Sequence, residues 1–399
     1  MSDTSKNFRP NYLGAGSDIF KLACITGFLT VITLGIYRFW AKTRVRRFIW
    51  SSVRIDGDSA EYTGTGLEKL LGFLVAVVVL AIYLGILQVL LSFVGFSVLG
   101  SFAEPNPSPE QIIAQVAAAY ITVFAVLPLV FFAQYRGRRY MLSRTRWRGL
   151  RLGMTPGALG YMLRACMYLI LTILTLGILL PLQTFKLQKY MVDRQWFGDA
   201  QFSQNGKWTA LYPMMKHFLI GIGIFILASA VIGGLQIIGL GMLLMIIAYF
   251  WLIYGGVYFR VMSYRYLTDN QVLDGRITFQ TTTSVVEIVK LYILGGLLVG
   301  VVAIAAFLPI GLIAGDLFQS IAMGGTPASL IVIAVLYLVA LVVINGATLA
   351  LITQPVFAHF VTTTTVQEAQ HLTAIEQRAA DSMPDADGFA DALDVGGAF

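Results

Sequence analysis

Long apolar stretches alternate with shorter polar and basic segments along the whole chain. A helix that crosses a membrane needs about 18 or more predominantly apolar residues. Six stretches reach this length, and they are Leu70–Val98, Ile112–Phe132, Phe218–Ile232, Ile237–Tyr258, Leu291–Ile313 and Leu330–Ile352. Phe218–Ile232 reaches it only together with its flanking residues. The pattern predicts an all-α polytopic membrane protein.

Two further apolar segments, Ile19–Tyr37 and Tyr161–Leu182, fit two different topologies. About 20 apolar residues are what one crossing requires, so each segment has room for a single spanning helix. Alternatively, each is a re-entrant hairpin that turns at Thr33-Leu34-Gly35 or at Thr175-Leu176-Gly177. The backbone of such a turn must be covered by neighbouring helices. The chain therefore has either eight or six spans.

The distribution of charge favours the re-entrant alternative. All basic segments and both termini then face one side, in agreement with the tendency of Lys and Arg to stay in the cytoplasm. The connectors on the other side, around Ser101–Gln111, Gly233–Gly234 and Gly315–Thr326, contain no Lys or Arg. We therefore expect the basic face and the C-terminal tail to be cytoplasmic.

The composition agrees with a membrane protein that contacts acidic lipid. Of the 399 residues, 57% are hydrophobic and 12% are charged, whereas a soluble domain has about 25% charged residues. Residues 1–366 carry 27 Lys and Arg against 14 Asp and Glu. This excess predicts anionic membrane lipids as partners, and no folded soluble basic surface indicates a nucleic-acid partner. Residues 367–399 carry seven acids and one arginine and are expected to form an acidic, disordered tail.

A basic and aromatic segment followed by a hairpin signal recurs along the chain. In residues 33–68 an apolar run ends at Leu34-Gly35, Arg and Lys alternate with aromatic residues, and a turn follows at Asp56-Gly57. Asp-Gly between branched or aromatic residues predicts a β-hairpin. Related segments are Phe131–Met154, Thr175–Trp208, Tyr258–Thr282 and, in degraded form, Thr348–Val366.

The recurrence predicts a repeat-built helix bundle with short β-hairpins on its basic face. An integral membrane domain of residues 17–366 follows an N-terminal lead-in of residues 1–16, which we expect to be loosely ordered. Within this domain the units lie near residues 17–66, 112–157, 158–208, 237–283 and 330–366. An isolated two-stranded hairpin is marginal in water, so the hairpins are expected to pair with one another in one small sheet.

The first copy also carries a resemblance. Its sequence TLGIYRFWAKTRVRRF, followed by the Asp-Gly turn and YTGTGLE, resembles the YjgN family of bacterial inner-membrane proteins, and the resemblance covers nearly the whole chain. The third copy departs from this motif, because residues 37–40 are replaced there by Leu179-Leu180-Pro181-Leu182. The resemblance implies a multi-pass protein of the bacterial inner (plasma) membrane. It implies no substrate and no catalytic residue.

Basic and aromatic side chains at the membrane end of each unit are the candidate functional residues. They fit anchoring and orientation in the membrane, convergence on an anionic headgroup or other anionic ligand, or docking of the acidic tail. The candidate anion-binding residues are Arg44, Arg46, Arg47, Arg136, Arg138, Arg139, Arg144, Lys186, Lys189 and Arg265. The candidate interfacial aromatic residues are Trp40, Phe48, Tyr140, Tyr190 and Tyr266.

Signals of catalysis are absent from the sequence. The three histidines are not at ligand spacing from one another or from a cysteine, and Cys24 and Cys166 lie in apolar runs. No nucleotide-binding, zinc-protease or serine-nucleophile motif occurs. We therefore expect no catalytic residue, no cofactor and no metal, and an enzyme is the least favoured function.

Two functions remain. The first is transport or handling of a lipid or other anionic small molecule, which headgroup binding or a continuous cavity would favour. The alternative is a non-catalytic membrane scaffold that binds a partner through its hairpins or its acidic tail, which a solid core with an exposed sheet would favour. A protein partner and the oligomeric state are left open by the sequence.

Overall fold

The computed structural model describes residues 7–96, 108–322 and 328–378 of the chain. Within these ranges, six helical segments are long and apolar enough to cross a membrane, in agreement with the six predicted spans. They are α3 (Gly66–Phe93), α4 (Pro109–Ser143), the 3₁₀ segment η2 (Trp208–Met215) continued by α7 (Lys216–Gly233), α8 (Ile238–Asp269), α9 (Val285–Ala322), and α10 (Ala328–Thr348) continued by η3 (Leu349–Thr353) and α11 (Gln354–Thr363). Most of the predicted connector Ser101–Gln111 and part of Gly315–Thr326 lie outside the described residues.

Polar caps set the start of two spans. The side chain of Thr65 accepts a hydrogen bond from the Glu68 backbone N–H at 3.3 Å, and α3 begins at the next residue. Ser108 and Gln111 bond each other's backbone N–H groups at the start of α4. Such caps satisfy N–H groups that have no partner within the helix.

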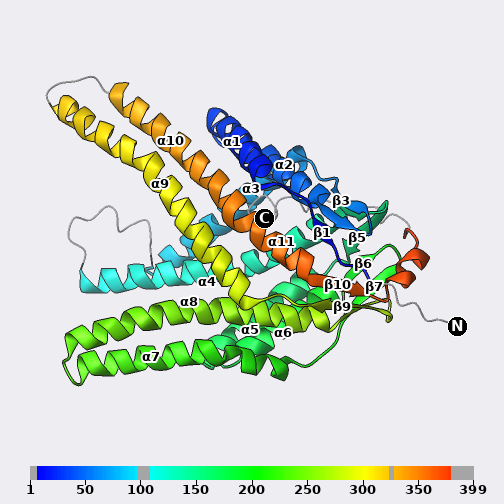
Figure 1. Cartoon of the computed structure of the whole chain (residues 1–399). Coiled ribbons are helices and arrows are strands. Elements are labelled where there is room, and N and C mark those ends of the chain that lie inside the picture. Colours follow the sequence, from blue (N-terminus) through cyan, green and yellow to red (C-terminus); the bar gives the residue numbers. More distant parts are fainter. Residues whose placement is uncertain (1–6, 97–107, 323–327, 379–399) are drawn as a thin grey trace.

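Ten short strands, each antiparallel to the next one in sequence, form a second layer at one end of the helices (Figure 1). They are β1 (Asn11–Tyr12), β2 (Val53–Ile55), β3 (Asp58–Tyr62), β4 (Thr145–Trp147), β5 (Leu150–Met154), β6 (Gln195–Phe197), β7 (Ala200–Gln204), β8 (Gln271–Leu273), β9 (Ile277–Thr281) and β10 (Thr364–Gln367). Phe8, just before β1, bridges Val366 in β10 through hydrogen bonds of 2.9 and 2.8 Å. This bridge closes the order of strands into what we call the strand ring.

Four hairpins of a three-residue and a five-residue strand make up most of the strand ring. The prediction that the hairpins pair with one another in one sheet is confirmed. The predicted turn at Asp56-Gly57 is present, with φ of 49° and 87°. The second hairpin turns at Arg148-Gly149 with φ of 51° and 76°. Because Arg-Gly lacks the Asp or Asn that favours a positive φ, sequence reasoning assigned no turn signal to this hairpin.

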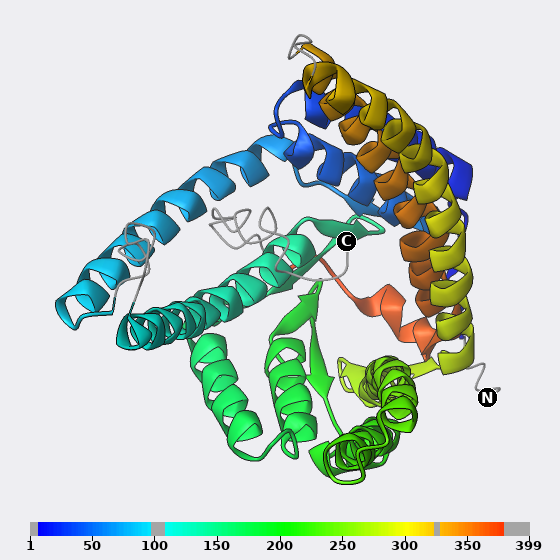
Figure 2. The ribbon, with the colours of Figure 1, turned by 90° about the vertical axis from the view of Figure 1, so that its left-hand side faces the viewer.

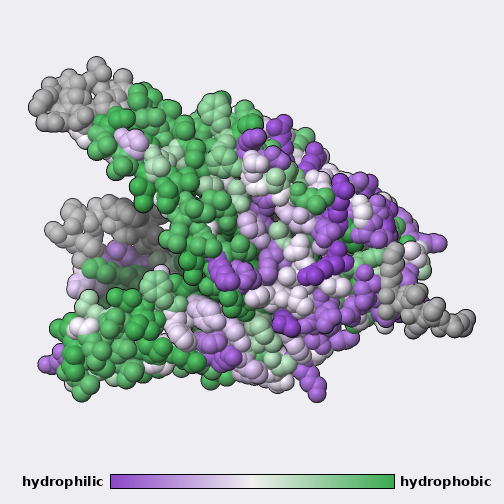
Figure 3. All heavy atoms as spheres, viewed as in Figure 1, coloured by the Kyte–Doolittle hydropathy of each residue, from purple (hydrophilic) through white to green (hydrophobic). Residues whose placement is uncertain are grey.

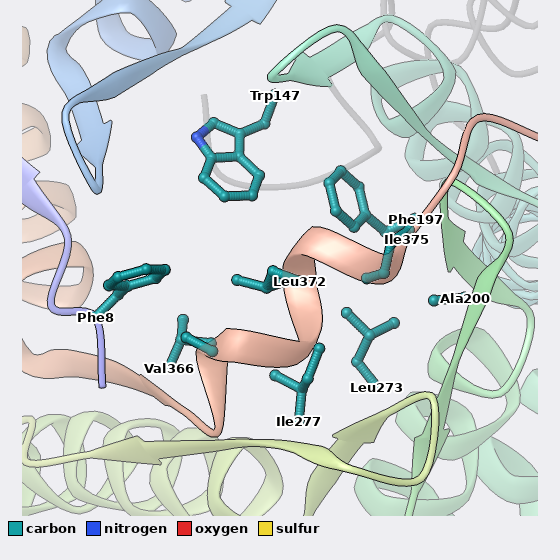
Figure 4. Close-up of a cluster of buried hydrophobic side chains, with 10 residues drawn as sticks. Phe8, Trp147, Phe197, Ala200, Leu273, Ile277, Val366, Leu372 and Ile375 are labelled. Atoms are coloured by element: carbon teal, nitrogen blue, oxygen red, sulfur yellow. The ribbon is translucent and has the colours of Figure 1, made fainter. Parts of the chain in front are cut away.

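The interior of the strand ring is filled by the C-terminal segment of the described chain (Figure 4). The 3₁₀ helix η4 (Ala369–Ala374) places Leu372 inside the ring, where it packs in one buried cluster with Ile375, Trp147 and Phe197. We call residues 369–378 the C-terminal plug. The expectation of a disordered tail from residue 367 is wrong for residues 367–378, because apolar residues at intervals of three provide a face that the ring buries. Residues 379–399 lie outside the described residues.

The N-terminal lead-in is also more ordered than expected. Phe8 is buried in the cluster that contains the C-terminal plug, and β1 pairs with Arg54 and Val53 of β2. The expectation of a loosely ordered segment is therefore wrong for residues 8–12. Residues 1–6 lie outside the described residues.

Both ambiguous apolar segments fold as helical hairpins. The first consists of α1 (Gly16–Ile32) and α2 (Arg38–Ser52), and the second of α5 (Ala158–Leu174) and α6 (Leu180–Val192). Each pair starts and ends at strands that pair with each other, β1 with β2 and β5 with β6. Neither hairpin can therefore end on the far side of a membrane, and the single-crossing alternative is wrong for both segments. The turns lie at the predicted Thr-Leu-Gly positions, where Leu34, Gly35, Leu176 and Gly177 have positive φ.

The spanning helices stand in pairs around the strand ring, with α3 beside α4, α7 beside α8 and α9 beside α10 (Figure 2). Apolar side chains cover the end of the molecule away from the ring, and polar side chains cover the ring (Figure 3). At most 22% of the residues in the most apolar part of any span are buried in the protein. The spans therefore present most of their apolar surface to the membrane.

Candidate anionic headgroup site

Equivalent basic residues of three units attach each helix to its own hairpin. Arg47 donates to the Gly64 carbonyl at 2.9 Å, and Arg139 donates to the Met154 carbonyl at 3.1 Å. In the third unit, Lys189 Nζ donates to the Gln204 carbonyl at 2.5 Å. Each acceptor lies at or just after the end of a five-residue strand, so the recurrence of these cations has a structural reason.

Acidic residues complete the same attachment in the third and fourth units. Asp193, at the end of α6, accepts from the Gln204 backbone N–H at 2.7 Å and pairs with Lys189 at 3.0 Å. Asp269, at the end of α8, accepts from the Thr281 backbone N–H at 2.7 Å, and Arg265 lies 4.0 Å away. These carboxylates fix the end of β7 and β9 to the helix that precedes the hairpin.

Three other candidate arginines are held by protein groups. Arg46 is buried and donates to the Tyr62 hydroxyl at 3.3 Å. Arg138 donates to the Gln195 side-chain oxygen at 2.9 and 3.0 Å, with that amide oriented to accept. Arg144 pairs with Glu68 at 3.0 Å.

Arg148, in the turn of the second hairpin, joins that hairpin to the first. It donates to Asp58 at 2.5 Å and to Asp56 at 2.7 Å. These bonds, first the one to Asp58 and then the one to Asp56, raise the pKa of Arg148 above its usual value. The guanidinium therefore remains charged and links the first two hairpins of the strand ring.

The candidate interfacial tyrosines lie at the joints between helices and strands. Tyr140 is buried and donates to Glu68 at 2.7 Å, and Tyr190 donates to the Gly157 carbonyl at 3.0 Å. The Tyr266 hydroxyl accepts from the Lys207 backbone N–H at 2.8 Å.

The two remaining candidate aromatic residues lie in the first unit. Trp40 lies against Gly66, where an added Cβ would come within 2.7 Å of the indole ring. Phe48 packs in a cluster with Ile19 and Ile49. Both rings thus support the packing of the α1–α2 hairpin and its junction with α3.

The remaining candidate cations are more accessible. Arg44 is exposed and lies over the Tyr37 ring, with 5.6 Å between the guanidinium carbon and the ring centre. Arg136 lies over the Phe132 ring at 5.7 Å. Together with Arg139 it lines a cavity of about 310 Å³ between α4 and the start of α5.

A denser group of cations surrounds a cavity of about 290 Å³ between α5 and α6. We call Arg164, Lys186, Lys189, Tyr190 and Arg194 the α5–α6 cluster. The guanidinium carbons of Arg164 and Arg194 lie 4.8 and 3.6 Å from the centre of the Tyr190 ring. Asp193 is the one acid that lines this cavity.

The cluster contains two accessible cations that face the cavity without an acid of their own. Arg164 and Lys186 are exposed, and within the described chain only Lys189 of the cluster forms an ion pair. Sequence reasoning selected Lys186, Lys189 and Tyr190 but missed Arg164 and Arg194. Their signal was available, because residues 164 and 186 are basic positions at the same end of two antiparallel helices.

A third cavity, of about 450 Å³, lies where the α1–α2 hairpin meets α10. Arg38, Lys42 and Asn345 supply charged and polar groups to its lining, and Thr26 and Thr30 supply hydroxyls. Small and aliphatic residues of α1, α2, α10 and η3 make up the rest of the wall. Cavities that combine cations with an apolar wall thus occur beside both helical hairpins.

Among the described residues, no three His, Cys, Asp or Glu side chains are grouped so that they could hold a metal ion. The polar groups that line these cavities are cations, hydroxyls, the Asp193 carboxylate and the Asn345 amide.

Comparison with known proteins identifies similarity to one protein family. Residues 8–299 match the model of a family described as bacterial protein of unknown function (DUF898). A curated relative from Salmonella typhimurium, named Inner membrane protein YjgN, is 22% identical over 174 residues, which cover 41% of this chain and 38% of the relative. Its namesake from Escherichia coli O157:H7 is 25% identical over 138 residues, or 35% of this chain and 29% of the relative. The aligned part is thus well under half of either relative.

No solved structure matches the chain. The family model covers most of the chain, and both relatives are inner membrane proteins by name. The six apolar helical segments agree with that location. The chain therefore belongs to the YjgN (DUF898) family of bacterial inner-membrane proteins.

Proposed function

We propose that this inner-membrane protein handles or transports an anionic lipid, and that the α5–α6 cluster binds the phosphate of its headgroup. The observation that carries the proposal is the cavity of about 290 Å³ lined by four cations and one acid. Arginine forks match phosphate oxygens in geometry, and a lysine adds a point charge.

The surroundings of the cluster suit a lipid better than a soluble anion. Leu163 of α5, just before Arg164, is exposed, and so are Met167 and Ile170 after it. An acyl chain can lie along these side chains while the phosphate contacts the cations. A soluble anion would make no use of this apolar surface.

We further propose that the strand ring faces the cytoplasm and that the fold arose from an internal repeat. The strand ring and its basic helix ends face the cytoplasm, where Lys and Arg accumulate and anionic lipid gives the membrane surface a negative potential. The four helix–hairpin segments are copies of one internal repeat, which their common order of a three-residue and a five-residue strand supports.

The test compares two charge-neutralised variants of the full chain. The test variant carries Arg164→Gln and Lys186→Gln, and the control carries Lys207→Gln and Lys216→Gln, which removes the same charge outside the cluster. A hydrogen bond to a charged group contributes about 1.5–3 kcal/mol, so loss of two cations should weaken retention of phosphatidylglycerol by about tenfold or more. Native mass spectrometry measures retained lipid.

Two further arms separate the possible sources of the phosphate. Phosphatidylcholine should be retained weakly by the unsubstituted protein and by both variants. Inorganic phosphate should compete poorly with phosphatidylglycerol, because it lacks acyl chains. Equal retention of phosphatidylglycerol by the test and control variants would contradict the proposal, and full competition by inorganic phosphate would replace the lipid with a soluble anion.

One observation supports the scaffold alternative. The interior of the strand ring is packed with apolar side chains around Leu372, which gives this face a solid core. Exposed turns such as Asp56-Gly57 would then bind the partner. Photocrosslinking from Gly57 in cells should give one discrete adduct if the protein is a scaffold, and no adduct if it acts alone.

A further inference from the structure

We propose that the turns of the α1–α2 and α5–α6 hairpins are inserted among the acyl chains of the leaflet nearest the strand ring. The inference is independent of headgroup binding. It rests on four properties of the two turns, which are the exposure of their tips, their backbone hydrogen bonds, their conformation and their depth along neighbouring spans.

The tip of each hairpin is a fully exposed leucine. Leu34 is 93% exposed and Leu176 is 91% exposed, and Ile36 and Ile178 beside them are also exposed. These four side chains lie at the end of a helix pair and are more than half exposed. Water is a poor environment for such a group, whereas hydrocarbon suits it.

The backbone N–H groups of the first turn need no water. Between Thr33 and Arg38 all six N–H groups have acceptors within the turn or in the last turn of α1. Gly35 donates to the Thr30 carbonyl at 2.7 Å, and Tyr37 donates to the Thr33 hydroxyl oxygen at 2.9 Å. An N–H group in hydrocarbon must be satisfied internally, and the N–H groups of this turn meet that condition.

The second turn repeats the arrangement residue by residue. Gly177 donates to the Thr172 carbonyl at 2.7 Å, and Leu179 donates to the Thr175 hydroxyl oxygen at 3.3 Å. The other four N–H groups from Thr175 to Leu180 also have acceptors in the same helix end or turn. A threonine side chain thus replaces water as the acceptor at the same position of both turns.

The conformation of the leucines is the third property. Leu34 and Leu176 both have φ of 51°, at the position after a helix end where glycine is the usual residue. A side chain in this left-handed conformation is unfavourable. Its presence at both tips is explained if contact of the leucine with lipid offsets the strain.

Contacts with the spans set the depth of each tip. Phe39, at the start of α2, contacts Phe73 in the second turn of α3, with 5.2 Å between ring centres. The tip at Leu34 lies about one helical turn, ~5 Å, beyond that level. In Figure 1 this turn lies well short of the far ends of α9 and α10. The hairpin therefore enters one leaflet and does not reach the other.

The second hairpin should insert more deeply than the first. Tyr168 of α5 packs in a cluster with Phe131 and Tyr135 of α4, and the tip at Leu176 lies about two helical turns, ~10 Å, further along. The residue after the first turn is Arg38, which keeps its charge near the headgroups, whereas the equivalent residue of the second turn is Leu180.

Depth-dependent fluorescence quenching tests the inference. Single cysteines replace Leu34, Leu176 or, as control, the exposed Ser59 of β3, in the full chain with Cys24→Ala and Cys166→Ala. Each is labelled with an environment-sensitive fluorophore in detergent, and the protein is reconstituted in phosphatidylcholine vesicles. The exposed tips tolerate the label because no neighbour packs on them.

The expected result is several-fold stronger quenching of both tip probes than of the Ser59 probe by lipids brominated on their acyl chains. The Leu176 probe should be quenched by deeper bromines than the Leu34 probe, and aqueous iodide should quench only the Ser59 probe. Iodide quenching of the tips equal to that of Ser59 would overturn the inference. So would labelling of a tip cysteine by an impermeant thiol reagent from the side of the membrane opposite to Ser59.

Discussion

Replacing Gly198 with alanine should release the C-terminal plug from the strand ring. Gly198 lies in the turn between β6 and β7 with φ of 58°. A Cβ there would come within 2.4 Å of the Glu376 carbonyl oxygen and 2.6 Å of Ile375. The carbonyl is backbone, so residues 375 and 376 have to move away.

The magnitude follows from what the movement breaks. Asp199 donates its backbone N–H to the Glu376 carbonyl at 2.9 Å, and Glu376 donates to the Asp199 side chain at 3.0 Å. Each hydrogen bond contributes about 1 kcal/mol, whereas the cost of a non-glycine residue in the left-handed conformation is present whether or not the plug is docked. The loss of about 2 kcal/mol of docking free energy corresponds to about a thirtyfold increase in the undocked fraction of the plug.

Hydrogen exchange of a peptide that covers Ala369–Glu376 measures this fraction, because local opening limits the exchange of protected amides. Gly275→Ala is the matched control. Gly275 also lies in a hairpin turn with φ of 67°, but an added Cβ there has no atom within 4 Å. Both variants carry the conformational cost, and only Gly198→Ala carries the collision.

Exchange of the plug peptide should accelerate by up to about thirtyfold in Gly198→Ala and stay unchanged in Gly275→Ala. Equal protection of this peptide in both variants would refute the reasoning, because the plug would then not depend on its contacts with the β6–β7 turn. Equal acceleration in both would show that strain in any hairpin turn loosens the ring.

Two further substitutions test contacts between neighbouring units. Arg148→Met removes the bonds to Asp56 and Asp58, and because Arg148 is partly exposed the loss should be about 1 kcal/mol and should shrink in high salt; a thermal melting temperature that is unchanged at low salt would contradict this. Tyr140→Phe removes the buried hydroxyl that donates to Glu68 at 2.7 Å, and should lower the free energy of unfolding by about 1–3 kcal/mol; a variant as stable as the parent protein would show that Arg144 alone satisfies this carboxylate.

The sequence alone determined the membrane part of the fold. Apolar length is a local property, and all six predicted spans are present. The positions of the turns at Thr33-Leu34-Gly35 and Thr175-Leu176-Gly177 were also predicted from the sequence, because a helix end of this kind depends on adjacent residues. Whether each segment crossed or turned back was undecided, since about 20 apolar residues serve either topology.

The roles of the basic residues could not be predicted from the sequence around them. Their recurrence at helix ends was plain, and anchoring, ligand binding and tail docking each explained it. The structure shows that Arg47, Arg139 and Lys189 bind backbone carbonyls of their own hairpins, whereas Arg164 and Lys186 line a cavity. The sequence does not say whether a given arginine binds a backbone carbonyl or lines a cavity. That depends on which backbone groups the fold brings within reach of the side chain.

Only the tertiary structure decided that the strands close into a ring. The bridge between Phe8 and Val366 joins opposite ends of the chain, and the Arg151 backbone N–H donates to Gln377, 226 residues later. Residues 369–378 read as part of a polar tail with at most a short helix, because Leu372 and Ile375 are the only large apolar side chains among them. They are ordered because the ring supplies, from eight of its ten strands, the apolar surface that the segment itself lacks. Burial of this kind is a property of the assembled surface and is not encoded in any one stretch of chain.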